Sequence, residues 1–293
     1  MSNAPAPIAP PILRLPLRHY QIARLYGPGM PASGQGGPRE RLLEQPLAQA
    51  GLVLVHCWNL GEPDGPYPIG PGAHCPGDPA DWVPTAHELI TQKIRPLLDA
   101  AREARMVVFH LAQSTYAPRY PQYQAIAADP DLQPPDPPRP VAGCVRPRPV
   151  EERWQDEYGP DFPGPVWVTH KGRFDIARAV RPLPDEPVVL DGWRLNGLCR
   201  RRDIDTLFYA GFMADLCLVN VPGAIREMAN RFGYRCVALR DCTTAYEFPD
   251  TYEGRWMNRA AIRLIETDLG YSASSEDLVA ALRSARGGPG GAP

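Results

Sequence analysis

The stretch 209–245 reads YAGFMADLCLVNVPGAIREMANRFGYRCVALRDCTTA, and it contains the pattern that decides the fold. Residues 206–211 (TLFYAG) form a short apolar run, which is typical of a strand buried on both faces. Residues 216–232 have the pattern of a helix, and Gly233 stands where a glycine commonly ends one. Residues 235–239 predict the next strand. Together these segments indicate a parallel strand–helix–strand unit.

The same alternation continues on both sides of this stretch. Residues 52–55 (LVLV) and 106–111 (MVVFHL) predict two more buried strands, joined by a helix at 85–104 that Pro96 should kink. We therefore expect an α/β fold with an open parallel sheet of five to six strands and helices on both faces, in three layers. The other predicted elements are a strand at 166–169, a helix at 191–202, an amphipathic helix at 252–268 and an edge strand at 271–274.

One main domain is expected at 51–280. Residues 1–50 are interpreted as an N-terminal extension with a possible hairpin, and 281–293 as a disordered tail. The main domain carries a proline-rich insertion at 113–165. An insertion of this length is typical of a lid, a binding loop or an assembly arm, and a surface decoration is the alternative.

Composition limits the classes of partner. The 293 residues include 31 basic and 33 acidic side chains, so a net charge of −2 predicts no nucleic-acid or membrane partner. The seven cysteines form no C-x-x-C pair, residues 1–11 lack a signal-peptide pattern, and no apolar run has the length of a membrane span. We expect a cytoplasmic protein with free thiols.

Cys217 is the most informative residue, because it lies where a predicted strand turns into a helix. Sites in open parallel sheets lie outside the carboxyl ends of the strands. The first turn of a helix favours the thiolate, which is the reactive form of cysteine, and its free N–H groups can hold an oxyanion. A buried structural cysteine is the alternative interpretation.

The stretch 209–245 also resembles the signature of the isochorismatase-like cysteine hydrolases, which include nicotinamidases and N-carbamoylsarcosine amidase. In that signature a strand ends in glycine, a cis-peptide corner follows, and the nucleophilic cysteine opens a helix, which is the position of Cys217. Gly233, Tyr234 and Asp241 match later landmarks, and the resemblance spans roughly residues 50–275. It implies hydrolysis of a C–N bond in a small amide, imide or ureido compound, through a thioester on the cysteine.

The resemblance further implies a catalytic triad of cysteine, lysine and aspartate. Lys171 matches the lysine, and it is one of two lysines among the 31 basic residues. His56 stands where the family has its aspartate, in the run VHCWN at 55–59. An imidazole can also move a proton, with a pKa near neutrality. Three alternatives remain: a Cys/His/Lys site, a site completed by Glu62 or Asp64, or an inactive relative.

The remaining candidate residues surround this triad. By analogy with the family's corner, the backbone N–H groups of Met213 and Cys217 are expected to hold the oxyanion. Four residues near the inferred strand ends are candidates for substrate binding: Trp58, Asn59, Phe174 and Tyr246.

No cofactor and no metal are expected, although zinc near His56 and His74 is an alternative. His110 is interpreted as a core histidine and His87 as a solvated one. The resemblance implies a homo-oligomer, a dimer or tetramer, acting on a small molecule. The competing hypothesis is a catalytically inactive binding or scaffolding protein on the same fold.

Overall fold

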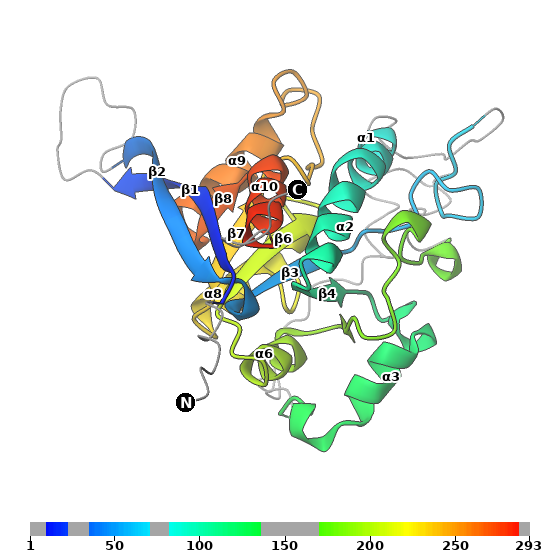
Figure 1. Cartoon of the computed structure of the whole chain (residues 1–293). Coiled ribbons are helices and arrows are strands. Elements are labelled where there is room, and N and C mark those ends of the chain that lie inside the picture. Colours follow the sequence, from blue (N-terminus) through cyan, green and yellow to red (C-terminus); the bar gives the residue numbers. More distant parts are fainter. Residues whose placement is uncertain (1–9, 23–34, 71–81, 136–169, 287–293) are drawn as a thin grey trace, which may run out of the picture.

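The computed structural model describes residues 10–22, 35–70, 82–135 and 170–286 (Figure 1). They form an α/β fold around one mixed sheet of eight strands, in the order β2-β1-β8-β7-β6-β3-β4-β5. The strands are β1 (Ile12–Ile22), β2 (Gln35–Pro46), β3 (Ala50–Val55), β4 (Val107–Leu111), β5 (Val188–Val189), β6 (Thr206–Gly211), β7 (Arg235–Leu239) and β8 (Tyr271–Ala273).

The parallel core of the sheet is the one expected from the apolar runs. Strand β3 pairs in parallel with both β4 and β6, and β7 joins β6 in the same direction. The expected count of five to six strands was too low. The N-terminal hairpin extends the sheet, because β1 pairs antiparallel with both β2 and β8. The two-residue strand β5 adds to the opposite edge.

Alternating side chains of the central strands pack into two hydrophobic cores, one on each face of the sheet. Leu52 and Leu54 of β3 face one core, while Val53 and Val55 face the other. Since successive side chains of a strand point to opposite faces, the sheet is covered on both sides (Figure 1). The helices of the first core are α1 (Trp82–Leu89), α2 (Arg95–Glu103) and α10 (Ser275–Arg286), and those of the second are α6 (Gly192–Arg200), α8 (Ile225–Asn230) and α9 (Trp256–Leu264).

Three of the predicted helices are interrupted. The one expected at 252–268 is α9, which begins at Trp256 and is followed by a π-helical turn, Ile265–Leu269. The helix expected at 85–104 is α1 and α2 with a π-helical turn, Ile90–Ile94, between them, which ends two positions before Pro96. Proline lacks the N–H that would continue the regular ladder. The prediction of one continuous helix at 216–232 was wrong. The segment consists of α7 (Cys217–Asn220) and α8, separated at Pro222.

The insertion and the C-terminal segment also differ from expectation. The described part of the insertion contains a helix, α3 (Pro121–Ala128), and the remainder, with the strand expected at 166–169, lies outside the described residues. The prediction that the chain is disordered from residue 281 was wrong, because α10 continues to Arg286 and buries Leu278 and Leu282. Within the described ranges, no helix combines the length and apolarity needed to cross a membrane.

Candidate functional site

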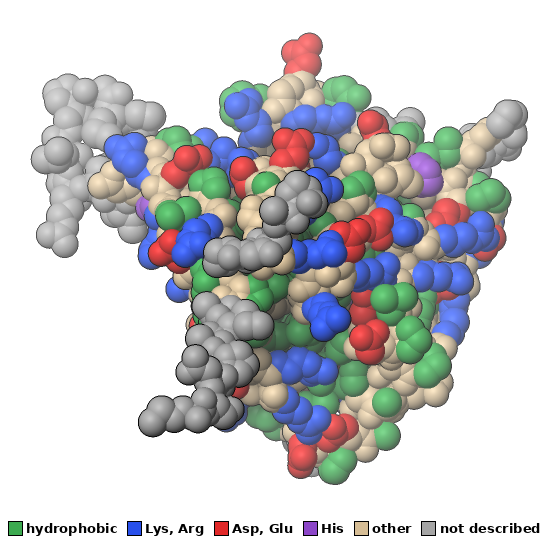
Figure 2. Space-filling view, in the orientation of Figure 1, with side chains coloured by type: hydrophobic (Ala, Val, Ile, Leu, Met, Phe, Trp, Pro, Cys, Tyr) green, Lys and Arg blue, Asp and Glu red, His purple; other side chains and the backbone are tan. Residues whose placement is uncertain are grey.

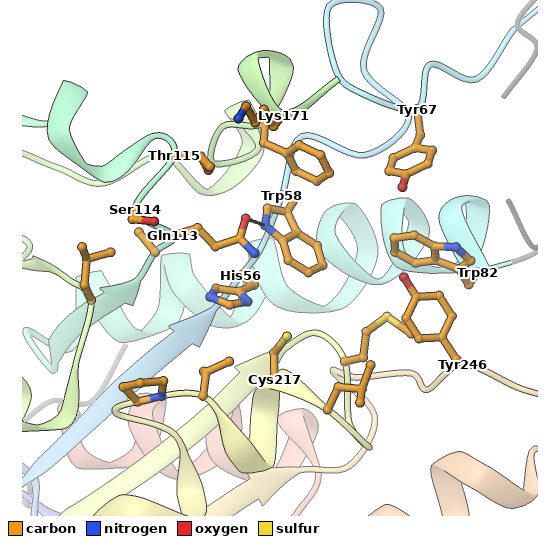
Figure 3. A pocket seen from close by; sticks show the side chains of 17 residues that line it. His56, Trp58, Tyr67, Trp82, Gln113, Ser114, Thr115, Lys171, Cys217 and Tyr246 are labelled. Carbon is orange, nitrogen blue, oxygen red and sulfur yellow. Dashed lines mark hydrogen bonds between the residues drawn. The ribbon is translucent and has the colours of Figure 1, made fainter. Parts of the chain in front are cut away.

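A cavity of about 750 Å³ opens at the carboxyl ends of β3, β4 and β6 (Figure 3). This is the edge of a parallel sheet at which ligand sites form. Its volume is in the range of small-molecule pockets. The lining residues are His56, Trp58, Tyr67, Trp82, Ala112, Gln113, Ser114, Thr115, Lys171, Phe174, Leu190, Met213, Leu216, Cys217, Val221, Pro222 and Tyr246.

Cys217 lies in this cavity and is partly exposed to it. It is the first residue of α7, and its sulfur points into the open space (Figure 3). The chain reaches it through a tight corner in which the Met213 carbonyl accepts hydrogen bonds from the N–H groups of Leu216 and Leu218, at 3.1 and 3.0 Å. The Phe212–Met213 peptide is cis, as the resemblance implied.

The electrostatics of the Cys217 thiol differ from those predicted. Burial raises its pKa above the usual thiol value, a hydrogen bond from the Met213 backbone lowers it, and the charge of Asp215 raises it again. The expectation of a favoured thiolate is therefore wrong for the protein without substrate.

His56 faces the thiol from the end of β3 (Figure 3). Its side chain is buried, its backbone has a φ of 46°, and its N–H donates to the Leu111 carbonyl at 3.0 Å. Burial lowers the pKa of His56 to about 4, although a hydrogen bond to the Ala112 backbone acts in the opposite direction. The ring is thus neutral at pH 7, and the expected pKa near neutrality is wrong. Its Nδ1 is buried without a hydrogen-bond partner among the described residues.

Lys171 lines the cavity but does not lie beside the thiol. It opens a short 3-10 turn, Lys171–Arg173, and in Figure 3 it lies beyond Trp58, at the opposite end of the cavity from Cys217. The expectation of an ammonium adjacent to the sulfur is not met in this structure. The charge that shifts the pKa of Cys217 is that of Asp215.

Asn59 and the two carboxylates considered as substitutes also lie elsewhere. Asn59 is buried outside the cavity lining, and its side chain binds the backbone of the segment that follows Lys171. Asp64 forms an ion pair with Arg178 at 2.6 Å, and Glu62 accepts a hydrogen bond from the Arg178 N–H at 2.7 Å. Neither carboxylate lines the cavity, so neither replaces the missing aspartate.

Aromatic rings form most of one wall. Trp58, Phe174, Tyr67, Trp82 and Tyr246 follow one another in edge-to-face contacts, with centroid separations of 5.9, 6.1, 5.7 and 5.2 Å. Three of these rings were predicted as substrate-binding residues. Tyr67 and Trp82 were missed because nothing in their local sequence marks them. The wall suits a planar, largely apolar ligand.

One polar group is fixed against this wall. The Trp58 Nε1–H donates to Gln113 Oε1 at 3.1 Å, which holds both side chains at the edge of the cavity. Gln113 is the second residue after β4 and lies at the carboxyl end of that strand. Its amide group remains available to bind a ligand carbonyl.

The histidines give no metal site within the described ranges, where no three His, Cys, Asp or Glu side chains are close enough to hold an ion. His74 lies outside those ranges, so the zinc alternative that includes it is not described. His110 is a core histidine, as predicted, with its Nε2 2.9 Å from Glu186 Oε2. His87 is not simply solvated, because its Nδ1 lies 2.7 Å from the Leu60 carbonyl.

Fold and cavity together define an α/β protein with a cysteine at the end of a central strand. Residues 80–267 match the Isochorismatase domain, and the chain belongs to the isochorismatase family of hydrolases, most of which are amidases. Comparison with curated proteins gives no match.

Three solved structures are similar to this chain at low identity, and the first of them supports the fold. A cysteine hydrolase from Pseudomonas syringae pv. phaseolicola aligns with a TM-score of 0.51 and 17% identity, covering 82% of this chain and 94% of that one. An N-carbamoylsarcosine amidase from Thermoplasma acidophilum gives 0.41 and 16%, covering 78% and 97%. A nicotinamidase/pyrazinamidase from Bacillus subtilis gives 0.37 and 16%, covering 77% and 100%.

Proposed function

We propose that this protein is a cysteine hydrolase that cleaves the C–N bond of a small amide, imide or ureido compound through a thioester on Cys217. The observation that carries the proposal is that the Cys217 sulfur and the neutral His56 ring face each other inside the aromatic-walled cavity (Figure 3). A nucleophile paired with a proton acceptor is the arrangement that covalent catalysis needs.

In the proposed reaction, the substrate carbonyl lies against the aromatic wall with its carbon over Cys217. The sulfur attacks this carbon while the thiol proton passes to His56. The tetrahedral oxyanion is held by the backbone N–H groups of Met213 and Cys217. When the intermediate collapses, His56 gives the proton to the leaving nitrogen, and the C–N bond breaks to leave a thioester.

Water then attacks the thioester carbon and transfers a proton to His56. Collapse of this second intermediate breaks the C–S bond, releases the carboxylic acid and returns the proton to the sulfur. The low pKa of His56 makes the imidazolium short-lived in both halves of the reaction. A raised thiol pKa likewise favours attack and proton transfer in one step over a preformed thiolate.

Lys171 takes a different part from the one implied by the resemblance. Because it lies at the far end of the cavity, we assign its ammonium to a polar or anionic group of the substrate remote from the scissile bond. An ammonium acts there as a compact point charge. The substrate class that fits is a planar ring system with an amide at one end and a polar group at the other.

The proposal is tested with wild-type protein, Cys217→Ala and Cys199→Ala. Cys199 is a buried cysteine outside the cavity, so its variant controls for the loss of a thiol. A panel of aromatic carboxamides, cyclic imides and N-carbamoyl compounds is incubated with each protein, and released ammonia or amine is measured. We expect release by the wild type and Cys199→Ala but not by Cys217→Ala, with an acyl adduct on Cys217 in rapidly quenched samples. Equal release by all three proteins contradicts the proposal.

A non-catalytic binding protein is the second candidate. It is favoured by the raised pKa of Cys217 and by the position of Lys171, which lies at the opposite end of the cavity from the thiol in Figure 3. This hypothesis predicts that compounds from the same panel raise the melting temperature of wild type and Cys217→Ala alike, without any turnover. Turnover that depends on Cys217 rejects it.

A further inference from the structure

A second pocket, of about 260 Å³, is lined by residues of α9 and of the N-terminal hairpin. The two elements lie side by side in Figure 1. None of its residues lines the Cys217 cavity. The alternation of β1 sends Leu15 and Leu17 into the core, so Arg18 and Tyr20 flank the opposite side and reach this pocket. The lining residues are Arg18, Tyr20, Pro38, Arg240, Asn258, Arg259, Ile262, Arg263 and Glu266.

Four guanidinium groups and one carboxylate line this pocket, which we call the arginine pocket. The carboxylate, Glu266, is buried and already engaged: it accepts a hydrogen bond from Arg18 at 2.6 Å and another from the Ser272 hydroxyl at 2.5 Å. Arg18 and Glu266 therefore neutralise each other. The positive charges of Arg240, Arg259 and Arg263 are not neutralised by a carboxylate of the pocket.

These three arginines have no carboxylate within ion-pair distance among the described residues. Two of them are held over aromatic rings instead, Arg259 over Trp256 at 4.7 Å and Arg263 over Tyr20 at 4.2 Å. A ring face positions a guanidinium but does not cancel its charge.

Several arginines outside the pocket have a carboxylate partner, whereas others on the described surface, such as Arg226 and Arg283, have none among the described residues. Arg201 lies against Asp129, and Arg178 against Asp64. On the face shown in Figure 2, basic and acidic side chains are interspersed, as expected for a net charge of −2. Three unneutralised guanidinium groups around one small pocket repel one another, and a bound anion would relieve that repulsion.

We propose that the arginine pocket binds a small phosphate-bearing anion, either inorganic phosphate or the phosphoryl group of a phosphomonoester. The planar fork of arginine matches phosphate oxygens in pairs, and a phosphoryl group carries close to two negative charges at pH 7. Asn258 adds a polar group to the same wall: its Oδ1 is buried with no partner in the described part of the chain, and it accepts a hydrogen bond from a protonated oxygen or an adjacent hydroxyl.

The size of the pocket argues against a polymer. A volume of about 260 Å³ suits a single phosphoryl group with a short substituent. Nucleic acids bind through many phosphate contacts spread over a surface, and the net charge of this chain is negative. A free phosphate compound and a lipid headgroup share the proposed chemistry, and the experiment separates them.

Binding is measured by isothermal titration calorimetry on the full chain with inorganic phosphate and with glycerol phosphate, at constant ionic strength set by sodium chloride. Three proteins are compared: wild type, the double variant Arg240→Gln/Arg259→Gln, and Arg283→Gln. Arg283 lies on α10 outside the pocket and controls for the loss of a surface charge. Co-sedimentation with phosphatidylcholine vesicles, with and without phosphatidic acid, tests the lipid source.

We expect wild type and Arg283→Gln to bind both phosphate probes with equal affinity, and the double variant to bind at least about tenfold more weakly, as the loss of charge-assisted hydrogen bonds implies. Arginine-dependent binding confined to vesicles with phosphatidic acid supports the same chemistry from a lipid. Two results overturn the proposal: no heat from phosphate at millimolar concentration with no vesicle binding, or equal affinity in all three proteins.

Discussion

Asn59 and Asp175 are joined by a pair of reciprocal hydrogen bonds. The Asn59 backbone N–H donates to the Asp175 carbonyl at 3.0 Å, and the Asp175 N–H donates to Asn59 Oδ1 at the same distance. The Asn59 side-chain amide also donates to the Arg173 carbonyl at 3.0 Å. The loop after β3 is thereby bound to the segment that carries Lys171 and Phe174, so that residues 116 positions apart form one wall of the cavity.

Replacing Asn59 by alanine should loosen this wall. The substitution removes two part-buried side-chain hydrogen bonds and leaves the Asp175 N–H and the Arg173 carbonyl without these partners, so we expect a loss of about 2 kcal/mol in the free energy of unfolding. Urea unfolding measures this loss. Gln124→Ala, which removes an exposed side-chain bond to the Pro118 carbonyl, is the control and should change stability by less than about 0.5 kcal/mol. Equal losses in both variants would show that the wall does not depend on Asn59.

Gly211 is the position at which an added methyl group should be tolerated least. Its φ is +120°, and a Cβ there would lie 2.0 Å from the Val55 carbonyl oxygen. Gly211→Ala must therefore force β6 away from β3 at the strand end that carries His56, and we expect a loss of about 3 kcal/mol or more. Thermal and urea unfolding give the value. Gly172→Ala is the matched control, because a Cβ at Gly172 meets no atom within 4 Å. A stable Gly211→Ala protein contradicts the packing described at this corner.

The parts of the fold that the sequence predicted are those determined by local pattern. The apolar runs at β3 and β6 are long enough and bounded clearly enough to identify buried strands. The membership of β1 in the sheet was not predictable in this way, since its pairing with β8 joins Arg18 to Ser272. The break before α8 did have a local signal, Pro222, which was outweighed by the helical pattern around it.

The residues of the candidate site were predictable where they belong to a sequence motif. They were not predictable where tertiary packing alone brings them to the cavity. Cys217 and His56 were identified through the strand ends, and the structure places both in one cavity. Trp82 and Gln113 reach the same cavity from separate segments, and no local feature distinguishes them from ordinary core or loop residues. The direction of the Lys171 side chain depends on the turn that contains it, which spacing alone does not determine.

The buried neutral state of His56 should make stability depend on pH. Its pKa is about 4 in the folded protein and 6.5 as the reference for an exposed side chain, so below pH 6.5 the unfolded state binds a proton that the folded state does not. The contribution of the neutral His56 ring to the free energy of unfolding is fully present above pH 6.5. It is lost as the pH falls towards 4, by about 3 kcal/mol in total.

Urea unfolding of wild type and His56→Asn between pH 7 and pH 4 measures the part of the pH-dependent stability loss that is due to His56. Asparagine also tolerates the positive φ of this position. The lowered pKa of His110 acts in both proteins and cancels in the difference. We expect the wild type to lose more stability than the variant over this range. Parallel curves would mean that His56 takes up its proton over the same pH range in the folded and unfolded states.

The thiol of Cys217 should be slow to react at neutral pH and should become reactive as the pH rises. Burial is the main cause of its raised pKa, so the thiolate fraction at pH 7 is below that of an ordinary cysteine, and the rate of alkylation should increase through a pKa above the usual thiol value. Iodoacetamide labelling between pH 7 and pH 10, followed by peptide mass spectrometry, gives the rate at each cysteine. Cys199 serves as the internal reference, because burial raises its pKa to about 12 and it lies outside the cavity. Among the five cysteines that the structure describes, Cys217 is expected to be labelled selectively at high pH. Rapid labelling already at pH 7 would instead require a cation beside the sulfur, and would return Lys171 to the place that the family resemblance assigns to it.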